Sequence, residues 1–467
     1  MNLRSQVLRG SLYLVMREGF GMVISIATML LITRSIGPEQ YGIFAASYGI
    51  AIFLQNFGHL GIGIYLVRQE ETEDSAISQV FNQAFTLFLI LGTGLIALGY
   101  IAAPAIESWS RLKNMTSVLQ ILMLFSMPAL LSQVPMAMLE RDLKFKQVAW
   151  VELLGQILYF LIALPLSIHH FGAFAPAIAW CAQQIQNLIL LTFCARYVPK
   201  LTWDSTVIKD MLRYSVGISS SAWVWYLQSL IAPLVVGRFA GEAAVGYVAL
   251  ATRLVDVLAF AKNATYRISI SALARVQGDP DRLRRAVTEG MGLQILALGP
   301  LLVGASWIGP SLLPMVFGRE WEPVMEVYPY IALCSLSNAL FNLHSSVLYV
   351  LRKPWAVTGF HASYVVVFAS LAWLLVPRFN HIGYGIADAC AIVTYIVIHR
   401  SFSRTIGSPD YTMALIWWAG FSIALFQATL GWWVAIVLFG VLAIPQTRQR
   451  IMGYVQSVRR LKMEAKT

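Results

Sequence analysis

Long apolar segments separated by short polar turns run through almost the whole chain. Crossing the hydrocarbon core of a bilayer takes about 20 mostly apolar residues in a helix. Each arm of the last apolar pair is short for a span, so the pattern predicts twelve to fourteen transmembrane helices. The predicted segments are 12–33, 41–67, 80–103, 115–138, 148–168 and 172–195, then 213–236, 244–272, 287–309, 325–349, 356–376 and 382–399, and finally 412–427 and 431–446.

Composition places the chain in the same class. Of its 467 residues, 58% are hydrophobic and 12% are charged, whereas about a quarter of the residues of soluble domains are charged. We therefore predict an all-α polytopic membrane protein without a sizeable soluble domain. The four cysteines lack metal-ligand spacing and favour apolar packing, so neither a metal nor a cofactor is expected. They are Cys181, Cys194, Cys334 and Cys390.

The loop charges predict an orientation. With the N-terminus inside, most of the 34 Lys and Arg residues fall in inside loops and in the C-terminal tail, as the positive-inside rule requires. We expect both termini in the cytoplasm, and the net charge of +11 reflects this asymmetry and anionic lipids rather than nucleic acid. The basic tail either lies on the inner membrane surface or is solvated. The cations of the outside loops are Arg34, Arg111, Lys113, Arg238, Arg319 and Arg378.

A short pattern occurs once in each half of the chain. Arg34, Gly37, Gly42 and Ala45 have the spacing of Arg238, Gly241, Gly246 and Ala249, and both sets lie at an outside turn. Six predicted helices separate the two copies, so the halves have the same orientation, as in transporters built from parallel repeats. We predict the following domains: a six-helix bundle in 1–196, a cytoplasmic linker in 197–211, a second six-helix bundle in 212–404, an extra helix pair in 405–446 and a basic cytoplasmic tail in 447–467.

Several of these segments resemble one family of transporters. The stretch from Arg34 to Phe44 is similar to the turn after the first helix of Wzx-type polysaccharide flippases, in the multidrug/oligosaccharidyl-lipid/polysaccharide (MOP) exporter superfamily. The stretches 139–146, 241–251 and 317–321 resemble further turns of that family, in the right order. The resemblance implies a bacterial inner-membrane protein that moves undecaprenyl-pyrophosphate-linked oligosaccharides to the outer leaflet, driven by an ion gradient. Its implied partners are the lipid-linked substrate, membrane lipids and the polysaccharide polymerase and export machinery.

Charges inside the membrane are costly and are therefore candidate functional groups. Arg253 and Lys262 are predicted to face a central cavity and bind pyrophosphate, with Arg267 near its inner mouth, because guanidinium groups bind phosphate oxygens in a bidentate manner. The alternative is a structural pair between Arg253 and Asp256, with Arg267 reaching the inner interface. The carboxylates Asp256, Glu18 and Asp388 are the candidates for ion coupling.

Uncharged polar groups extend the candidate site. Gln55 and His59 lie four residues apart on one helix face, where they bind sugar hydroxyls or form interhelical hydrogen bonds. Trp223, Tyr226 and Gln228 suit either a sugar site or an interfacial belt.

Arg34 and Arg238 line an exit or, as the favoured interpretation, cap the helix that precedes each of them.

The sequence carries no enzyme motif, neither a phosphate-binding loop nor a nucleophile elbow nor a zinc-binding pattern. We expect a transporter rather than an enzyme. The alternatives are an exporter of another amphiphile, such as the peptidoglycan lipid precursor or a drug, and less favourably a membrane glycan polymerase or ligase. A drug exporter for cations would favour acidic cavities, whereas the charge-rich segment 244–272 is basic, and a polymerase would need a longer outside loop.

Overall fold

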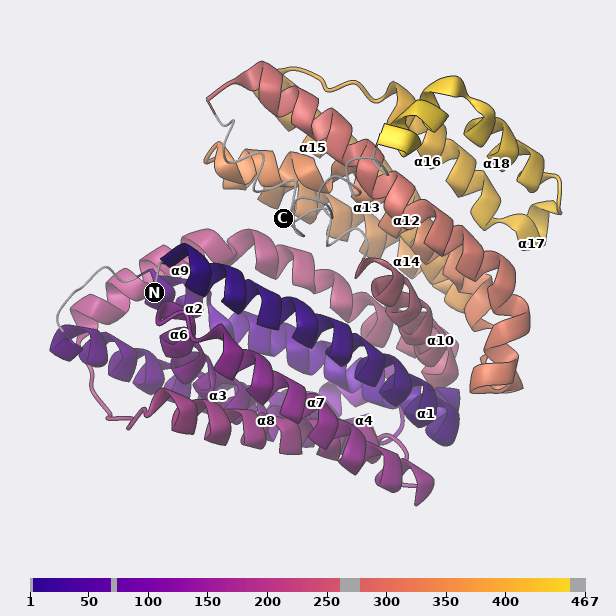
Figure 1. The fold of residues 1–467 in the computed structure, drawn as a ribbon. Helices are drawn as coiled ribbons and strands as arrows, with labels where there is room; N and C mark the ends of the chain where they lie inside the picture. Colours follow the sequence, from indigo (N-terminus) through magenta and orange to yellow (C-terminus); the bar gives the residue numbers. More distant parts are fainter. Residues whose placement is uncertain (1–2, 69–73, 261–277, 454–467) are drawn as a thin grey trace. The chain divides into compact units, whose positions relative to one another are not determined.

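The computed structural model describes residues 3–68, 74–260 and 278–453, and every regular element in these ranges is a helix (Figure 1). The first part of the chain forms α1 (Leu3–His59), α2 (Ile62–Val67), α3 (Asp74–Ser110), α4 (Met115–Leu124), α5 (Ser126–Leu131), α6 (Gln133–Arg141), α7 (Phe145–Ile168) and α8 (Phe174–Ala195). The second part forms α9 (Ser205–Tyr226), α10 (Gly237–Leu258), α12 (Pro280–Phe317), α13 (Val324–Val350), α14 (Pro354–Ala391), α15 (Tyr395–Ile406), α16 (Thr412–Leu425), α17 (Gln427–Leu430) and α18 (Val434–Ala443).

Three of these helices contain a sharp kink where the sequence predicts a turn. Gly37 in α1 has φ 74° and ψ 170°, and Gly241 in α10 has φ 83° and ψ −175°. Only glycine adopts this backbone region readily. Asn380 kinks α14 with φ 50° and ψ −137°. Each kink falls between two predicted segments, so these helical stretches each hold two of them.

The described residues contain nine helical stretches that are long and apolar enough to cross a membrane. The three stretches with kinks, Gly21–Val67, Ser219–Leu258 and Pro354–Ile406, are 47, 40 and 53 residues long, and each overlaps two predicted segments. The prediction of an all-α polytopic membrane protein is thereby confirmed. The final pair is short, as expected, with 14 residues in α16 and 10 in α18.

The seventh predicted segment is an irregular helix. Asp204 caps α9 by accepting a hydrogen bond of 2.8 Å from the Thr206 amide, so the helix begins within the predicted linker. After α9 the chain passes through a 3₁₀ turn at Leu227–Leu230 and a π-helical turn at Ala232–Val236, which contains Pro233. Such interruptions often mark hinges or functional positions. The corresponding part of α1 has no such interruption before Gly37.

The contacts divide the chain into two compact units. Unit 1 comprises residues 1–250, 313–324 and 361–387. Its apolar core includes Leu139, Val148, Val151 and Leu191, which join α6, α7 and α8. The domain boundaries predicted from the sequence stay a prediction.

Unit 2 comprises residues 251–312, 325–360 and 388–467. Its core contains the fully buried Trp417, whose indole nitrogen donates to Thr447 at 2.9 Å. The Arg450 guanidinium also lies 5.9 Å from the centre of the Trp417 ring. The helical start of the C-terminal tail is therefore attached to α16.

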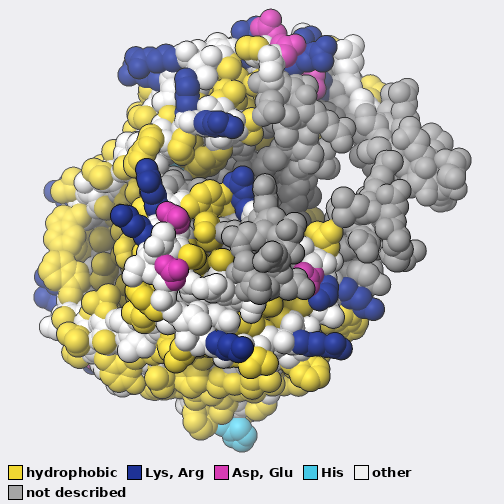
Figure 2. Space-filling view, turned by 90° about the vertical axis from the view of Figure 1, so that its left-hand side faces the viewer, with side chains coloured by type: hydrophobic (Ala, Val, Ile, Leu, Met, Phe, Trp, Pro, Cys, Tyr) yellow, Lys and Arg dark blue, Asp and Glu magenta, His cyan; other side chains and the backbone are white. Residues whose placement is uncertain are grey.

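Large apolar side chains cover much of the surface, which is yellow over wide areas in Figure 2. Ile101 and Phe193 are each 79% exposed, and Leu161 is 60% exposed. Soluble monomers rarely expose apolar side chains over wide areas. Such a surface is what helices require when lipid is their solvent.

Candidate functional site

The two copies of the repeated pattern meet inside unit 1. We call the region formed by residues 34–42 and 238–246 the repeat junction. A Cβ atom on Gly42 would overlap the Glu242 carbonyl oxygen and lie 2.9 Å from the Gly246 nitrogen. A Cβ atom on Gly246 would overlap the Pro38 carbonyl oxygen. The second glycines of the two copies thus allow two backbones to approach more closely than any side chain permits.

The arginines of the two copies make matching contacts. Arg34 Nη1 donates to the Val316 carbonyl at 3.1 Å, in the last turn of α12. Arg238 Nη1 donates to the Trp109 carbonyl at 2.9 Å, in the last turn of α3. The expectation that each arginine caps its own preceding helix is therefore wrong. Each arginine caps the C-terminal end of a helix from the other half of the chain, because that end lies beside the repeat junction.

Aromatic rings pack around the repeat junction. Trp321, which follows α12 and is fully buried, lies 5.8 Å from Tyr41 and 6.3 Å from Tyr247, measured between ring centres. Trp109 stacks on Trp373 at 6.0 Å. Tyr41, Tyr247 and Trp321 belong to three stretches on which the family resemblance rests, and the structure brings these stretches together.

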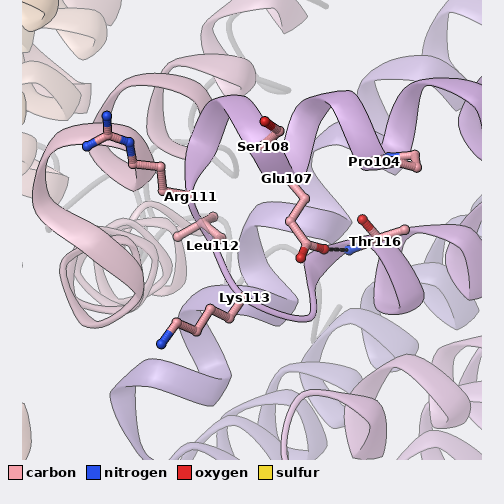
Figure 3. A pocket seen from close by; sticks show the side chains of 7 residues that line it. All are labelled: Pro104, Glu107, Ser108, Arg111, Leu112, Lys113 and Thr116. Carbon is pink, nitrogen blue, oxygen red and sulfur yellow. Dashed lines mark hydrogen bonds between the residues drawn. The ribbon is translucent and has the colours of Figure 1, made fainter.

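A pocket of about 320 Å³ lies next to the repeat junction (Figure 3). Glu107 occupies its wall and accepts a 2.6 Å hydrogen bond from the Thr116 amide, while Arg111 and Lys113 extend away from Glu107. The Lys113 amide donates to Glu242 at 3.1 Å. The pocket is therefore braced by hydrogen bonds at helix ends, and its cations do not converge on one point. Its lining residues are Pro104, Glu107, Ser108, Arg111, Leu112, Lys113 and Thr116.

The predicted pyrophosphate site is described only in part. Arg253 and Asp256 are exposed and lie three residues apart on α10, as the sequence implies. Lys262 and Arg267 lie outside the described residues, and so does the side chain of Glu18. The cavity role of these charges stays a prediction.

The predicted sugar-binding groups belong to unit 1. Gln55 is 4% exposed and donates to Ser126 Oγ at 2.9 Å, which joins α1 to α5. His59 is half-buried one turn further along, and its Nε2 atom has no hydrogen-bond partner among the described residues. Gln55 therefore forms the interhelical bond expected as the alternative to sugar binding.

The aromatic cluster at the end of α9 contacts two other helices of unit 1. The Trp223 indole nitrogen donates to the Asn56 carbonyl at 3.3 Å, and Tyr226 is 37% exposed. Gln228 is half-buried in the 3₁₀ turn that follows. Trp225, which belongs to the same aromatic cluster, lies 4.9 Å from the His361 ring. The histidine was missed because its place beside α9 depends on a contact that is distant in sequence.

Asp388 belongs to unit 2 and is 8% exposed, with Cys334 and Tyr395 beside it. Tyr395 accepts a hydrogen bond of 3.3 Å from Asn338. This predicted coupling residue thus lies in a buried polar cluster. Among the described residues, no group of three or more His, Cys, Asp or Glu could hold a metal ion.

The fold is that of transporters of the MOP superfamily. It is similar to the lipid II flippase MurJ in an inward closed conformation, with a TM-score of 0.75 and 12% identity, over 97% of this chain and 99% of that one. It is also similar to an inward-facing multidrug resistance transporter of the MATE family, with a TM-score of 0.66 and 14% identity, over 84% of this chain and 98% of that one. At such low identity these likenesses establish the fold alone.

The family described as "Polysaccharide biosynthesis protein" matches residues 31–326, and the chain belongs to it. Lipopolysaccharide biosynthesis protein WzxC of Escherichia coli (strain K12) is 19% identical over 95% of this chain and 90% of its own length.

Two other relatives align over less of their length. Teichuronic acid biosynthesis protein TuaB of Bacillus subtilis (strain 168) is 23% identical over 64% of this chain, and succinoglycan biosynthesis transport protein ExoT of Rhizobium meliloti (strain 1021) is 20% identical over 70% of it. The matches span 61% and 65% of the lengths of these two relatives. The family and the superfamily predicted from the sequence are thereby confirmed.

Proposed function

We propose that the protein is a flippase that moves undecaprenyl-pyrophosphate-linked oligosaccharide repeat units across the bacterial inner membrane for surface polysaccharide synthesis. Membership of the polysaccharide biosynthesis family supports the class of cargo. ExoT, a relative in sequence, is named as a transport protein. MurJ, whose fold is similar, is named as a flippase. The termini are proposed to be cytoplasmic, on the basis of the loop charges.

The observation that carries the proposal is the repeat junction. It is formed by equivalent parts of the two halves of the chain, and at Gly42 and Gly246 the backbones pass too closely for a side chain to fit. A transporter built from two parallel repeats alternates access by moving one repeat against the other. The repeat junction is the place where such motion would separate the halves, and by the proposed orientation it closes the outer end of the path.

Recognition of the cargo is assigned to the cations of α10 and the segment that follows it. Arg253 is exposed, and Arg253 with Lys262 supplies positive charge for a pyrophosphate, which is a dense anion. Arg267 is proposed to act near the inner mouth of the cavity. His59, Trp223, Tyr226 and Gln228 are proposed to contact the sugars.

Flipping in proteoliposomes tests this function. Purified protein is reconstituted with a fluorescent undecaprenyl-pyrophosphate-linked glycan, with and without a proton or sodium gradient. We expect flipping that a gradient stimulates and that the Arg253→Ala/Lys262→Ala double variant loses. Full flipping by the double variant would refute the cationic site and leave the function standing.

A second candidate cargo is the peptidoglycan lipid precursor. Lipid II is the cargo that the name of MurJ states, and MurJ shares this fold. The same proteoliposomes distinguish the two, because wild-type protein that moves this precursor and none of the polysaccharide precursors would replace the proposed cargo.

A further inference from the structure

The connection between α8 and α9 is fastened to α3 within unit 1. We call residues 196–204 the connecting segment. The Tyr197 hydroxyl and the Lys200 amide both donate to Asn82 Oδ1, at 2.9 and 3.1 Å. The Tyr197 ring is buried and lies 6.0 Å from the Phe85 ring, measured between ring centres. The first part of the predicted linker is therefore held in a defined position along α3.

The other side of the connecting segment exposes large apolar side chains. The Thr202 amide donates to Thr86 Oγ1 at 3.1 Å, which gives the segment another anchor on α3. Val198, Leu201 and Trp203 are 74%, 69% and 55% exposed. They alternate with the anchored residues, so the hydrogen bonds to α3 hold these three side chains on the outer side. Leaving such side chains in water is unfavourable, which indicates that an apolar environment covers them.

The exposed face of α8 leads directly to these side chains. Ile185, Ile189 and Phe193 are exposed and lie four residues apart, so they share one face of the helix. In a helix that crosses a bilayer, an exposed apolar face is in contact with lipid. Tryptophan is enriched where the hydrocarbon meets the headgroups, and Trp203 belongs to the segment that follows this face. The connecting segment therefore begins where the lipid-facing surface of α8 ends.

Exposed cations accompany the apolar side chains. Among the described residues, none of these cations has an ion-pair partner. The carboxylates in the same stretch are fewer, since only Asp204, which caps α9, and the exposed Asp210 belong to it. Net positive charge beside exposed apolar side chains is typical of segments that bind anionic membrane surfaces. The cations are Arg196, Lys200, Lys209 and Arg213.

We propose that residues 196–213 form a docking surface for the headgroups of anionic phospholipids. The cations hold the headgroup phosphates, while Val198, Leu201 and Trp203 enter the interfacial layer of the bilayer. The continuity with the exposed face of α8 favours lipid over a protein partner, because lipid already covers that face. The surface belongs to the chain whatever cargo the protein moves, so it does not rest on the proposed function. By the proposed orientation of the termini, it binds the inner leaflet.

Quenching by lipids with brominated acyl chains tests the docking surface. With the four native cysteines replaced, Leu201→Cys in the full chain carries an environment-sensitive fluorophore. The protein is reconstituted in vesicles that contain brominated phosphatidylglycerol or, at the same fraction, brominated phosphatidylcholine. We expect both lipids to quench the fluorophore and phosphatidylglycerol to quench it more strongly, because the cations gather the anionic lipid around the segment.

Neutralising the cations of the docking surface should bring the ratio of the two quenching values to one. A matched control that neutralises four exposed cations of other turns should keep the wild-type ratio, although its net charge is the same. The test variant is Arg196→Gln/Lys200→Gln/Lys209→Gln/Arg213→Gln. The control variant is Arg111→Gln/Lys113→Gln/Arg319→Gln/Arg378→Gln.

Three results would overturn the proposal. Absence of quenching by either lipid would show that the segment faces water or a protein partner. Equal quenching by the two lipids in the wild-type chain would show that the surface has no preference for anionic headgroups. A ratio that the test variant keeps, or that both variants lose equally, would show that these four cations do not select the lipid. None of these readings depends on flipping, so failure of the proposed function leaves the test intact.

Discussion

The two copies of the repeated pattern share their backbone geometry and differ in what surrounds it. Gly37 and Gly241 have the same unusual conformation, and Gly42 and Gly246 form the same close approach. The helix before Gly37 is regular, whereas the one before Gly241 passes through 3₁₀ and π-helical turns. The shared glycines are those that the junction requires. The irregular turns give the second half a place where its helix can bend.

The largest expected effect comes from the closest contact. Gly42→Ala and Gly246→Ala each place a methyl group onto the backbone of the other copy, so the junction cannot close and the transport cycle stops. We expect flipping in proteoliposomes to fall to the rate of protein-free vesicles for both variants. Gly94→Ala on α3 is the control, because nothing lies within 4 Å of its added Cβ. Wild-type rates in both junction variants would contradict the need for this close approach, and a loss in only one of them would break the equivalence of the copies.

A smaller effect is expected at the first glycines. Gly37→Ala and Gly241→Ala put a side chain in a backbone region that costs about 1–3 kcal/mol outside glycine. Each is expected to lower the unfolding free energy by this amount, as measured by thermal denaturation in detergent. Similar losses of unfolding free energy would show that both copies need glycine at the kink. A loss at one position alone would show that only that kink requires glycine.

The smallest effect separates the two arginines. Arg238 bonds a carbonyl and also lies 4.1 Å above the Trp109 ring, whereas Arg34 is exposed and bonds the Val316 carbonyl. A cation over an aromatic ring contributes about 0.5–1 kcal/mol at exposed sites. Arg238→Gln should therefore destabilise the protein more than Arg34→Gln by about this amount in the same denaturation assay. The reverse order would contradict the difference assigned to the two copies.

Much of the fold follows from sequence because lipid imposes a simple rule on length and polarity. The apolar segments and the turns at Gly37 and Gly241 are predicted from it, and the structure has them wherever it describes the chain. The hydrogen-bond partners of Arg34 and Arg238 are not predicted from the sequence, since these partners lie on helices that are distant along the chain. The hydrogen bonds that join Tyr411 to His344 and His399 are not predicted for the same reason. Neither residue spacing nor composition reveals which helices pack together, and isolated histidines in apolar segments give no local signal.

The central claim is that the repeat junction opens during each transport cycle. Trp109 of the first half of the chain and Trp373 of the second half stack beside the junction, against Arg238 and Phe239, and are 45% and 43% exposed, so cysteines there would be accessible. With the four native cysteines replaced, Trp109→Cys/Trp373→Cys is bridged by a short reducible bifunctional thiol reagent, and flipping is measured before and after reduction. The account predicts no flipping while the bridge is intact and recovery once it is reduced. Flipping at the unbridged rate with the bridge intact would contradict it.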